Sequence, residues 1–178
     1  PSAATKAEEM INTLEEIAKQ ENDDNYLPGP IQYTLLIDAY AKSGTRDATK
    51  RAEAVIDRLL QANSGLGVSP TAQMMNAVMS TYANIGNVEA AAKATAILER
   101  MEYLKEFGQL VKPTVHSYSI AISAWAKCGT AAAAENAESI LNRLFDDYDE
   151  VLSRGDSNQY AEELKPNNVV FNSVIDAW

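Results

Sequence analysis

The stretch PGPIQYTLLIDAYAKSG, residues 28–44, recurs three times further along the chain. Aligned without gaps, its copies are PTAQMMNAVMSTYANIG (70–86), PTVHSYSIAISAWAKCG (113–129) and PNNVVFNSVIDAW (166–178). The first prolines of successive copies stand 42, 43 and 53 residues apart. A self-similar period of this size is typical of a solenoid, in which each repeat buries its apolar face only against its neighbours.

Each copy has the spacing of an amphipathic helix, and we call these four helices the A helices. Counting from Tyr33, apolar or small residues fall three, four, seven and eight positions later, which is one face of an α-helix. A proline stands just ahead of each helix, where its missing N–H costs little: Pro28, Pro70, Pro113 and Pro166. A glycine closes the first three copies, where a left-handed C-terminal cap is needed: Gly44, Gly86 and Gly129.

A second amphipathic run follows each glycine, and we call these runs the B helices. Their apolar positions are Ala52, Val55, Ile56 and Leu59, then Ala94, Ile97, Leu98 and Met101, then Ala137, Ile140, Leu141 and Leu144. The stretch 3–20 has the same register, with Ala7, Met10, Ile11 and Leu14, so we interpret it as a B helix without its A helix. The sequence therefore predicts an all-α fold in the order B, A-B, A-B, A-B, A.

The predicted organisation is one helical-repeat domain over residues 1–178. It divides into a partial repeat over 1–29, full repeats over 30–71, 72–114 and 115–167, and a partial repeat over 168–178. Because both ends fall inside a repeat, we expect the chain to be part of a longer protein.

The composition limits the classes of function. The 178 residues include 15 Lys and Arg against 25 Asp and Glu, and the net charge of −10 by itself argues against general attraction to nucleic-acid phosphates. Hydrophobic residues make up 46%, which is too many for a disordered chain. The sequence has no apolar run of about 18 residues, so it predicts no membrane-spanning helix and no membrane partner.

The A-helix pattern resembles a pentatricopeptide repeat: an aromatic residue, a small polar residue, then L-I-x-A-Y/W-A-K-x-G. The most specific strings are YTLLIDAYAKSG, YSIAISAWAKCG and KPNNVVFNSVIDAW. The resemblance implies a right-handed α-α superhelix. The W-x₂-L-G-x₂-Y pattern of tetratricopeptide repeats is absent. The repeats are longer than the roughly 34–35 residues usual for such helical hairpins. We expect most of the excess in solvent-facing loops such as 61–69 and 145–165.

A polar stripe runs beside the apolar stripe of each A helix, at the positions one, five and nine after Tyr33 or its counterparts Met75, Tyr118 and Phe171. It comprises Thr34, Asp38 and Lys42, then Asn76, Ser80 and Asn84, then Ser119, Ser123 and Lys127, and finally Asn172 and Asp176. A solvated helix face is the ordinary explanation, but such faces usually carry Lys and Glu, which are good helix formers. The choice of Thr, Asn and Ser favours a binding surface. Lys42 and Lys127 also balance Asp38 and Asp176, so these helices are neutral.

In pentatricopeptide repeats, the residue after the aromatic and the residue after the repeat-closing proline together read one RNA base. The resemblance implies three base-reading pairs and one unpaired residue: Thr34 with Thr71, Asn76 with Thr114, Ser119 with Asn167, and Asn172 alone. Ser with Asn resembles an adenine-preferring pair, and Asn in the first position favours pyrimidines. The residues two before the aromatic would sandwich the bases: Ile31, Gln73, His116 and Val169. Lys42 and Lys127 match a lysine that lies near the RNA phosphates.

Other conspicuous residues have structural explanations. The aromatic residues on the apolar stripe are expected to pack in the core: Tyr33, Tyr40, Tyr82, Tyr118, Trp125, Phe171 and Trp178. The arginines that recur at one B-helix position are expected to form salt bridges: Arg58, Arg100 and Arg143. The lone Cys128 makes no metal site, and the acidic run 146–150 lacks the glycine and closing glutamate of a calcium loop. No enzyme motif, cofactor motif or small-molecule site is recognisable.

Two hypotheses and a variant follow from these observations. The first is sequence-specific binding of single-stranded RNA, one base per repeat. By resemblance, this would serve RNA processing, stability, editing or translation in a mitochondrion or plastid. The alternative is a scaffold whose concave groove binds a protein or peptide partner, which the acidic total supports and the polar stripe opposes. As a variant, the repeats would recruit substrate for a catalytic domain beyond Trp178.

Overall fold

The structure is a computed structural model that describes residues 3–61, 68–106, 111–154 and 159–178. All regular elements of these residues are helices, and they form two compact units, Pro1–Thr81 and Tyr82–Trp178. The prediction of an all-α fold is confirmed. Within each unit, helices that follow one another in the chain pack as hairpins, such as α2 with α3 and α6 with α7.

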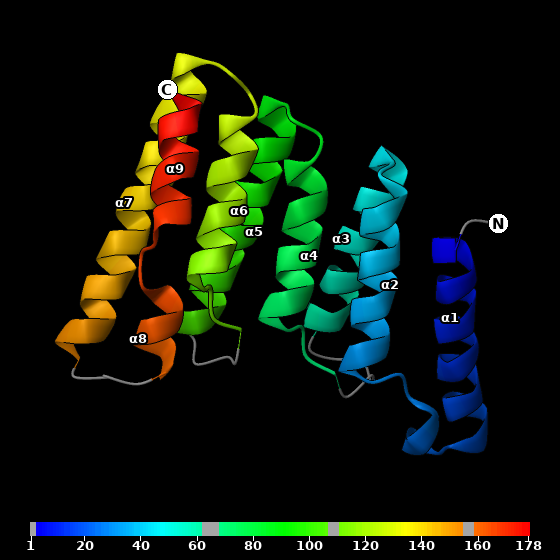
Figure 1. The fold of residues 1–178 in the computed structure, drawn as a ribbon. Coiled ribbons are helices and arrows are strands. Elements are labelled where there is room, and N and C mark those ends of the chain that lie inside the picture. The colour runs from blue at the N-terminus through cyan, green and yellow to red at the C-terminus, as the bar shows by residue number, and fades with distance from the viewer. Residues whose placement is uncertain (1–2, 62–67, 107–110, 155–158) are drawn as a thin grey trace. The chain divides into compact units, whose positions relative to one another are not determined.

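The first unit is built around α2 (Pro30–Ser43), which packs against both α1 (Ala3–Glu21) and α3 (Arg46–Leu60). A short 3-10 helix, η1 (Asp24–Tyr26), joins α1 to α2 (Figure 1). The fourth helix, α4 (Ala72–Ala83), has all but its last two residues in this unit. Both predicted A helices, α2 and α4, begin two residues after the expected prolines Pro28 and Pro70.

The second unit has α6 (Val115–Ala126) at its centre, packed against α5 (Val88–Glu106), α7 (Ala131–Ser153) and α9 (Asn168–Ala177). A six-residue helix, α8 (Gln159–Leu164), packs against α7 (Figure 1). The A helix α6 therefore lies against the B helices before and after it and against the next A helix, α9. This is the neighbour-to-neighbour packing that a repeat array requires.

A glycine followed by a capping residue sets the boundary between each A helix and its B helix. Gly44 and Gly129 have φ of 63° and 62°, a left-handed conformation that favours glycine, and Gly86 has 69°. Directly after Gly44 and Gly129, Thr45 and Thr130 cap the next helix by accepting the backbone N–H three residues on, each at 3.2 Å. The predicted glycine caps are confirmed.

The predicted apolar stripes form the core. Tyr33 and Tyr118 are 0% exposed, and Tyr40, Tyr82 and Trp125 are also buried. All four apolar positions of α3, α5 and α7 are buried as well. The periodicity therefore identified the buried face of these helices correctly.

Two expectations about the C-terminal part are wrong. Residues 145–153 continue α7 and 159–164 form α8, with Ala161 and Leu164 buried, so this stretch is not a solvent-facing loop. Apolar residues alternate with acidic ones in this stretch, so one side of it can pack against the rest of the unit. Phe171 and Trp178 are exposed rather than buried, because no helix covers that side of α9 in the part of the chain that the structure describes. Of the other expected loop, 62–67 lie outside the described residues.

Candidate nucleic-acid interface

The polar stripe of the second unit lies on two neighbouring A helices. α6 and α9 pack side by side, and the hydroxyl oxygens of Ser123 and Ser173 lie 3.3 Å apart across their contact. The stripe residues Ser119 and Asn172 belong to these two helices. The structure therefore brings the polar positions of successive A helices onto adjacent elements, as reading of neighbouring bases would require.

Two residues at the first predicted base-reading position form hydrogen bonds within their own helix. The hydroxyl of Thr34 donates to the carbonyl oxygen of Pro30, and that of Ser119 donates to Val115, each at 2.8 Å. Ser119 is also 9% exposed. These i to i−4 bonds occupy the hydroxyl proton but leave acceptor capacity on the oxygen. Each hydroxyl can accept a hydrogen bond as it stands and can donate one only by releasing its helix.

The two asparagines at the same position differ from the hydroxyl residues. Asn76 is 9% exposed, and its Oδ1 atom is buried with no hydrogen-bond partner among the residues that the structure describes. A buried acceptor without a partner costs about 1–3 kcal/mol. Asn172 is exposed on α9. The side-chain amide carries both a donor and an acceptor, which suits the edge of a base.

The residues at the second predicted base-reading position directly precede helices. Asn167 caps α9 by accepting the N–H groups of Val169 and Val170 at 3.0 and 3.3 Å, and the Thr71 hydroxyl accepts the N–H of Met74 at 3.2 Å. Thr114 precedes α6, and its own N–H donates to the hydroxyl oxygen of Ser117 at 3.1 Å. Capping already explains Thr and Asn at these places. It leaves the NH₂ group of Asn167 available to a ligand.

The predicted base-sandwiching residues are all exposed. Ile31 is 72% exposed on α2 and Val169 is 60% exposed on α9, and Gln73 and His116 are exposed as well. Leu35, one turn after Ile31, is 61% exposed as well, although it is not among the predicted site residues. Ile31 and Leu35 therefore form an exposed apolar pair on the surface of α2.

The two predicted phosphate-contacting lysines differ in their surroundings. Lys42 is exposed at the end of α2. Lys127 donates to the carbonyl oxygen of Ala83 at 3.0 Å and to Oδ1 of Asn84 at 3.2 Å. It thereby ties the end of α6 to the segment before α5. One of its three ammonium protons is left for another partner.

The structure also contains a polar contact that the sequence analysis did not predict, and it occurs twice: between α1 and α3 beside α2, and between α5 and α7 beside α6. Tyr33 donates to Glu15 at 2.7 Å, and Arg58 pairs with Glu15 at 3.1 Å. Tyr118, Glu102 and Arg143 repeat this arrangement at the matching positions in the second unit. The predicted salt bridges of Arg58 and Arg143 are confirmed. The partners Glu15 and Glu102 are more buried than those of a surface pair, whereas Glu99, a second partner of Arg143, is exposed. The sequence holds one indication of these pairs: Glu15 stands 43 residues before Arg58, and Glu102 stands 41 residues before Arg143.

The Tyr118 hydroxyl lies between two carboxylates. It is 2.9 Å from Glu102 and 2.7 Å from Asp147, which Lys105 in turn contacts at 2.7 Å. Burial, and then the two negative charges, raise the pKa of Tyr118 far above its ordinary value. Burial and the hydrogen bond to Glu15 raise the pKa of Tyr33 in the same way. Each carboxylate is paired with a cation, so the cluster stabilises the fold and offers no free acid or base.

These raised pKa values predict a loss of stability in alkaline solution. Below about pH 10, tyrosine is protonated in the folded and the unfolded chain, so the stabilisation is fully present. At higher pH the unfolded chain releases protons that the folded chain keeps, and each such tyrosine lowers the free energy of unfolding by about 1.4 kcal/mol per pH unit. Urea unfolding measured at several pH values above 10 gives the free energy of unfolding as a function of pH. For Tyr118→Phe this free energy should fall less steeply with pH, by about 1.4 kcal/mol per pH unit. An unchanged slope would contradict the role of Tyr118.

Other kinds of site find no support in the described residues. No three His, Cys, Asp or Glu residues among them are grouped so that they could hold a metal ion. Burial raises the pKa of the Cys128 thiol, which makes that cysteine less reactive. None of the described helices has the length and apolar character needed to cross a bilayer.

The resemblance to pentatricopeptide repeats rests on the A-helix strings, and the helical-hairpin packing is compatible with it. Of the three predicted base-reading pairs, Ser119 and Asn167 lie in one unit and Thr34 and Thr71 in the other, whereas Asn76 and Thr114 are divided between the two units. No protein-family model matches this sequence, and no curated protein matches it either.

Proposed function

We propose that the chain binds single-stranded RNA through its A helices, as part of a right-handed α-α superhelix of helical hairpins. The observation that carries the proposal is a small polar residue at the same position of every A helix, directly after Tyr33, Met75, Tyr118 or Phe171: Thr34, Asn76, Ser119 and Asn172. The proposed setting, by resemblance, is RNA processing, stability, editing or translation in a mitochondrion or plastid.

The chemistry of these positions supports base recognition. Sequence-specific proteins hydrogen-bond the exposed edges of unstacked bases, which offer both donors and acceptors. The buried Oδ1 of Asn76 has no partner among the described residues, and an amino or imino group of a base would satisfy it after a small side-chain movement. Asn172 is exposed and has the same chemistry. Ile31 and Val169 supply exposed apolar surfaces next to these positions, against which a base can pack.

The distribution of charge favours base-specific over indiscriminate binding. Several acids of the B helices are engaged by Arg51, Arg58, Arg143 and Lys105, so that part of the negative charge is paired within the fold. The A helices carry few cations, and Lys127 is partly engaged by the protein. Few phosphate contacts mean weak dependence of affinity on salt. The proposed complex therefore depends mainly on contacts with the bases.

The substitution Ser119→Asn tests the proposal. It places asparagine where α4 already has Asn76, and the resemblance predicts a change from adenine to pyrimidine at one RNA position. RNAs selected by the wild type and the variant from a random single-stranded pool should differ at that position. A preference of about tenfold corresponds to about 1.4 kcal/mol, a reasonable value for one changed hydrogen-bond pattern.

The matched control is Ser139→Asn, the same change at an exposed position of the B helix α7. It should select the same RNAs as the wild type. Identical selections from Ser119→Asn and the wild type would overturn the reading of bases by this position. If the wild type enriches no RNA but retains a peptide ligand, the scaffold alternative replaces the proposal.

A further inference from the structure

The last full repeat is longer than the two before it, and helix α8 accounts for part of the difference. The prolines that bound this repeat, Pro113 and Pro166, stand 53 residues apart, against 42 and 43 residues for the earlier repeats. Its B helix α7 has 23 residues, where α3 has 15 and α5 has 19, and α8 adds six more. In the described part of this repeat, the added length is therefore largely helical.

Helix α8 is anchored in the second unit and holds the chain shortly before α9. Ala161 and Leu164 of α8 are 5% and 0% exposed, and α8 packs against α7. Asn167, the predicted base-reading residue that caps α9, stands three residues after Leu164. Three residues of extended chain span only about 10 Å, so the buried Leu164 limits where Asn167 can lie.

Tyr160 joins α8 to the segment that precedes α6. Its hydroxyl donates to the carbonyl oxygen of Pro113 at 3.2 Å, and the Lys112 ammonium lies 4.8 Å from the centre of its ring. The second contact is a cation–π interaction, which adds to the hydrogen bond. Burial, and then the negative charge of Asp147, raise the pKa of Tyr160 above its ordinary value, so the hydroxyl keeps the proton that it donates.

The hydrogen bond from Tyr160 acts on the peptide group that joins Pro113 to Thr114, another predicted base-reading residue. The oxygen of this peptide group accepts the Tyr160 hydroxyl, and its N–H donates to the hydroxyl oxygen of Ser117 at 3.1 Å. A peptide group bonded at both ends has a fixed orientation, because the group is planar. The backbone at Thr114 is therefore held in place from α8 on one side and from α6 on the other.

Through these contacts α8 is linked to two neighbouring base-reading positions. Thr114 directly precedes α6 and Asn167 directly precedes α9, and these two helices pack against each other (Figure 1). Side chains that recognise a ligand must be held to within about 0.5 Å of their productive positions. A longer connection has more conformational freedom to lose, and a short helix packed on α7 and bonded to Pro113 removes part of that freedom.

We propose that α8 positions Thr114 and Asn167 for the reading of neighbouring bases, and that Tyr160 is the positioning residue. This inference rests on the proposed binding of single-stranded RNA. It gives the extra length of the last full repeat a role in that binding, because the added helix keeps the two reading positions at a fixed separation.

The substitution Tyr160→Phe tests this role, because it removes the hydroxyl and keeps the ring beside Lys112. Single-stranded RNAs are selected from a random pool by the wild type and by the variant. Thr114→Asn and Ser119→Asn, selected in the same way, locate the RNA positions that depend on Thr114 and on Ser119, the partner of Asn167. At these two positions Tyr160→Phe should weaken the preference for the favoured base by about threefold or more, within the range for one neutral hydrogen bond. Preferences at the other RNA positions should be unchanged.

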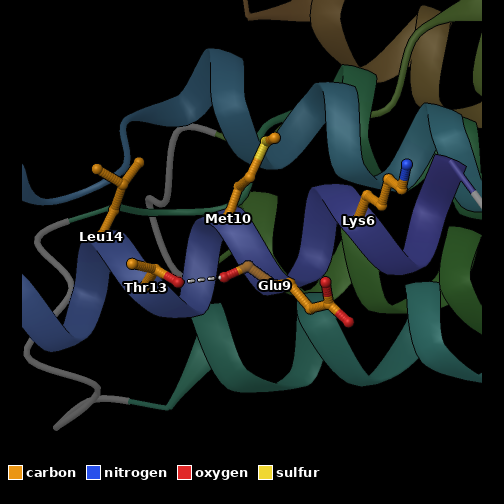
Figure 2. A pocket seen from close by; sticks show the side chains of 5 residues that line it. All are labelled: Lys6, Glu9, Met10, Thr13 and Leu14. Atoms are coloured by element: carbon orange, nitrogen blue, oxygen red, sulfur yellow. Dashed lines mark hydrogen bonds between the residues drawn. The ribbon is translucent and has the colours of Figure 1, made fainter. Parts of the chain in front are cut away.

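The control is Thr13→Val, which also removes a hydroxyl that donates to a backbone carbonyl. Thr13 bonds to Glu9 at 2.8 Å within α1, on the side that borders an open depression (Figure 2). Because this bond lies in the first unit and involves no base-reading residue, the variant should select the same RNAs as the wild type. Lys112→Met provides a second test variant, since it removes the cation from an exposed residue and should weaken the same two preferences.

The possible outcomes separate this inference from the proposed function. Circular dichroism and urea unfolding check that each variant is folded during selection, and Lys112→Met decides the question if Tyr160→Phe is not. If the folded variants select the same bases as the wild type, the inference is overturned and RNA binding stands. Weaker binding of all RNAs with unchanged base preferences overturns it as well, because this indicates a structural role alone. A wild type that selects no RNA overturns both.

Discussion

Replacing Glu15 with alanine is expected to lower the free energy of unfolding by about 3 kcal/mol, at the low end of the cost of breaking a buried ion pair. Glu15 is 7% exposed and accepts the hydroxyl of Tyr33 at 2.7 Å. Its loss leaves Arg58 and Tyr33 without their partner inside the first unit. The low end of the range applies because the Arg58 side chain is 36% exposed and water can partly solvate it.

The neighbouring residue provides the control for this prediction. Glu16→Ala removes the same charge from an exposed position of α1 and should change the free energy of unfolding by no more than about 0.5 kcal/mol. Glu15→Gln should fall between the two, because its amide oxygen still accepts the Tyr33 hydroxyl. Urea unfolding followed by circular dichroism measures all three. Equal losses for Glu15→Ala and Glu16→Ala would show that the buried contact contributes nothing.

Replacing Leu144 with alanine is expected to lower the free energy of unfolding of the second unit by about 2–5 kcal/mol, the range for deleting a buried leucine side chain. Leu144 is 0% exposed on α7, the helix that packs against α6 and α9. The substitution leaves a cavity among buried side chains, which adds to the loss of apolar burial. Trp125 and Trp178 both belong to this unit, so tryptophan fluorescence during urea unfolding reports on it.

Leu152→Ala is the matched control, because Leu152 lies on the same helix but is 46% exposed. It should cost well under 1 kcal/mol, since little apolar surface is returned to water. A similar loss in both variants would mean that the apolar stripe of α7 does not define the core.

The helices could be predicted because their determinants are local. The spacing of Tyr33, Leu36, Ile37 and Tyr40 fixes one buried face, and the glycine after each A helix has the left-handed conformation that ends it. Both signals repeat along the chain, so a weak pattern in one copy is supported by the others. The buried faces of α3, α5 and α7 follow from the same argument.

What could not be predicted depends on contacts between distant residues. The pairing of Glu15 with Tyr33 and Arg58 joins three helices, and nothing near Glu15 in the sequence distinguishes it from the exposed Glu16. The shorter length of pentatricopeptide repeats favours a loop over 145–165, yet residues 145–153 continue α7 and residues 159–164 form α8. Phe171 and Trp178 fit the apolar stripe, but a stripe does not show whether another helix covers it.

For the candidate site, the sequence predicts which residues lie on the A helices but not which hydrogen bonds their side chains form. The structure places Thr34, Asn76, Ser119 and Asn172 on the A helices, but Thr34 and Ser119 use their hydroxyl protons locally. It also assigns capping roles to Thr71 and Asn167, which the pattern alone cannot separate from base reading. The unpartnered amide oxygen of Asn76 and the exposed Leu35 are features that only the folded chain shows.

The measurement that tests the central proposal most directly is photo-crosslinking of the wild-type chain to single-stranded RNA containing 4-thiouridine, with the attachment sites located by mass spectrometry. The proposal predicts crosslinks on the A helices α2, α4, α6 and α9, concentrated near Ile31, Asn76, Ser119 and Val169. Crosslinks confined to the B helices α1, α3, α5 and α7, or no crosslinked RNA at all, would contradict it.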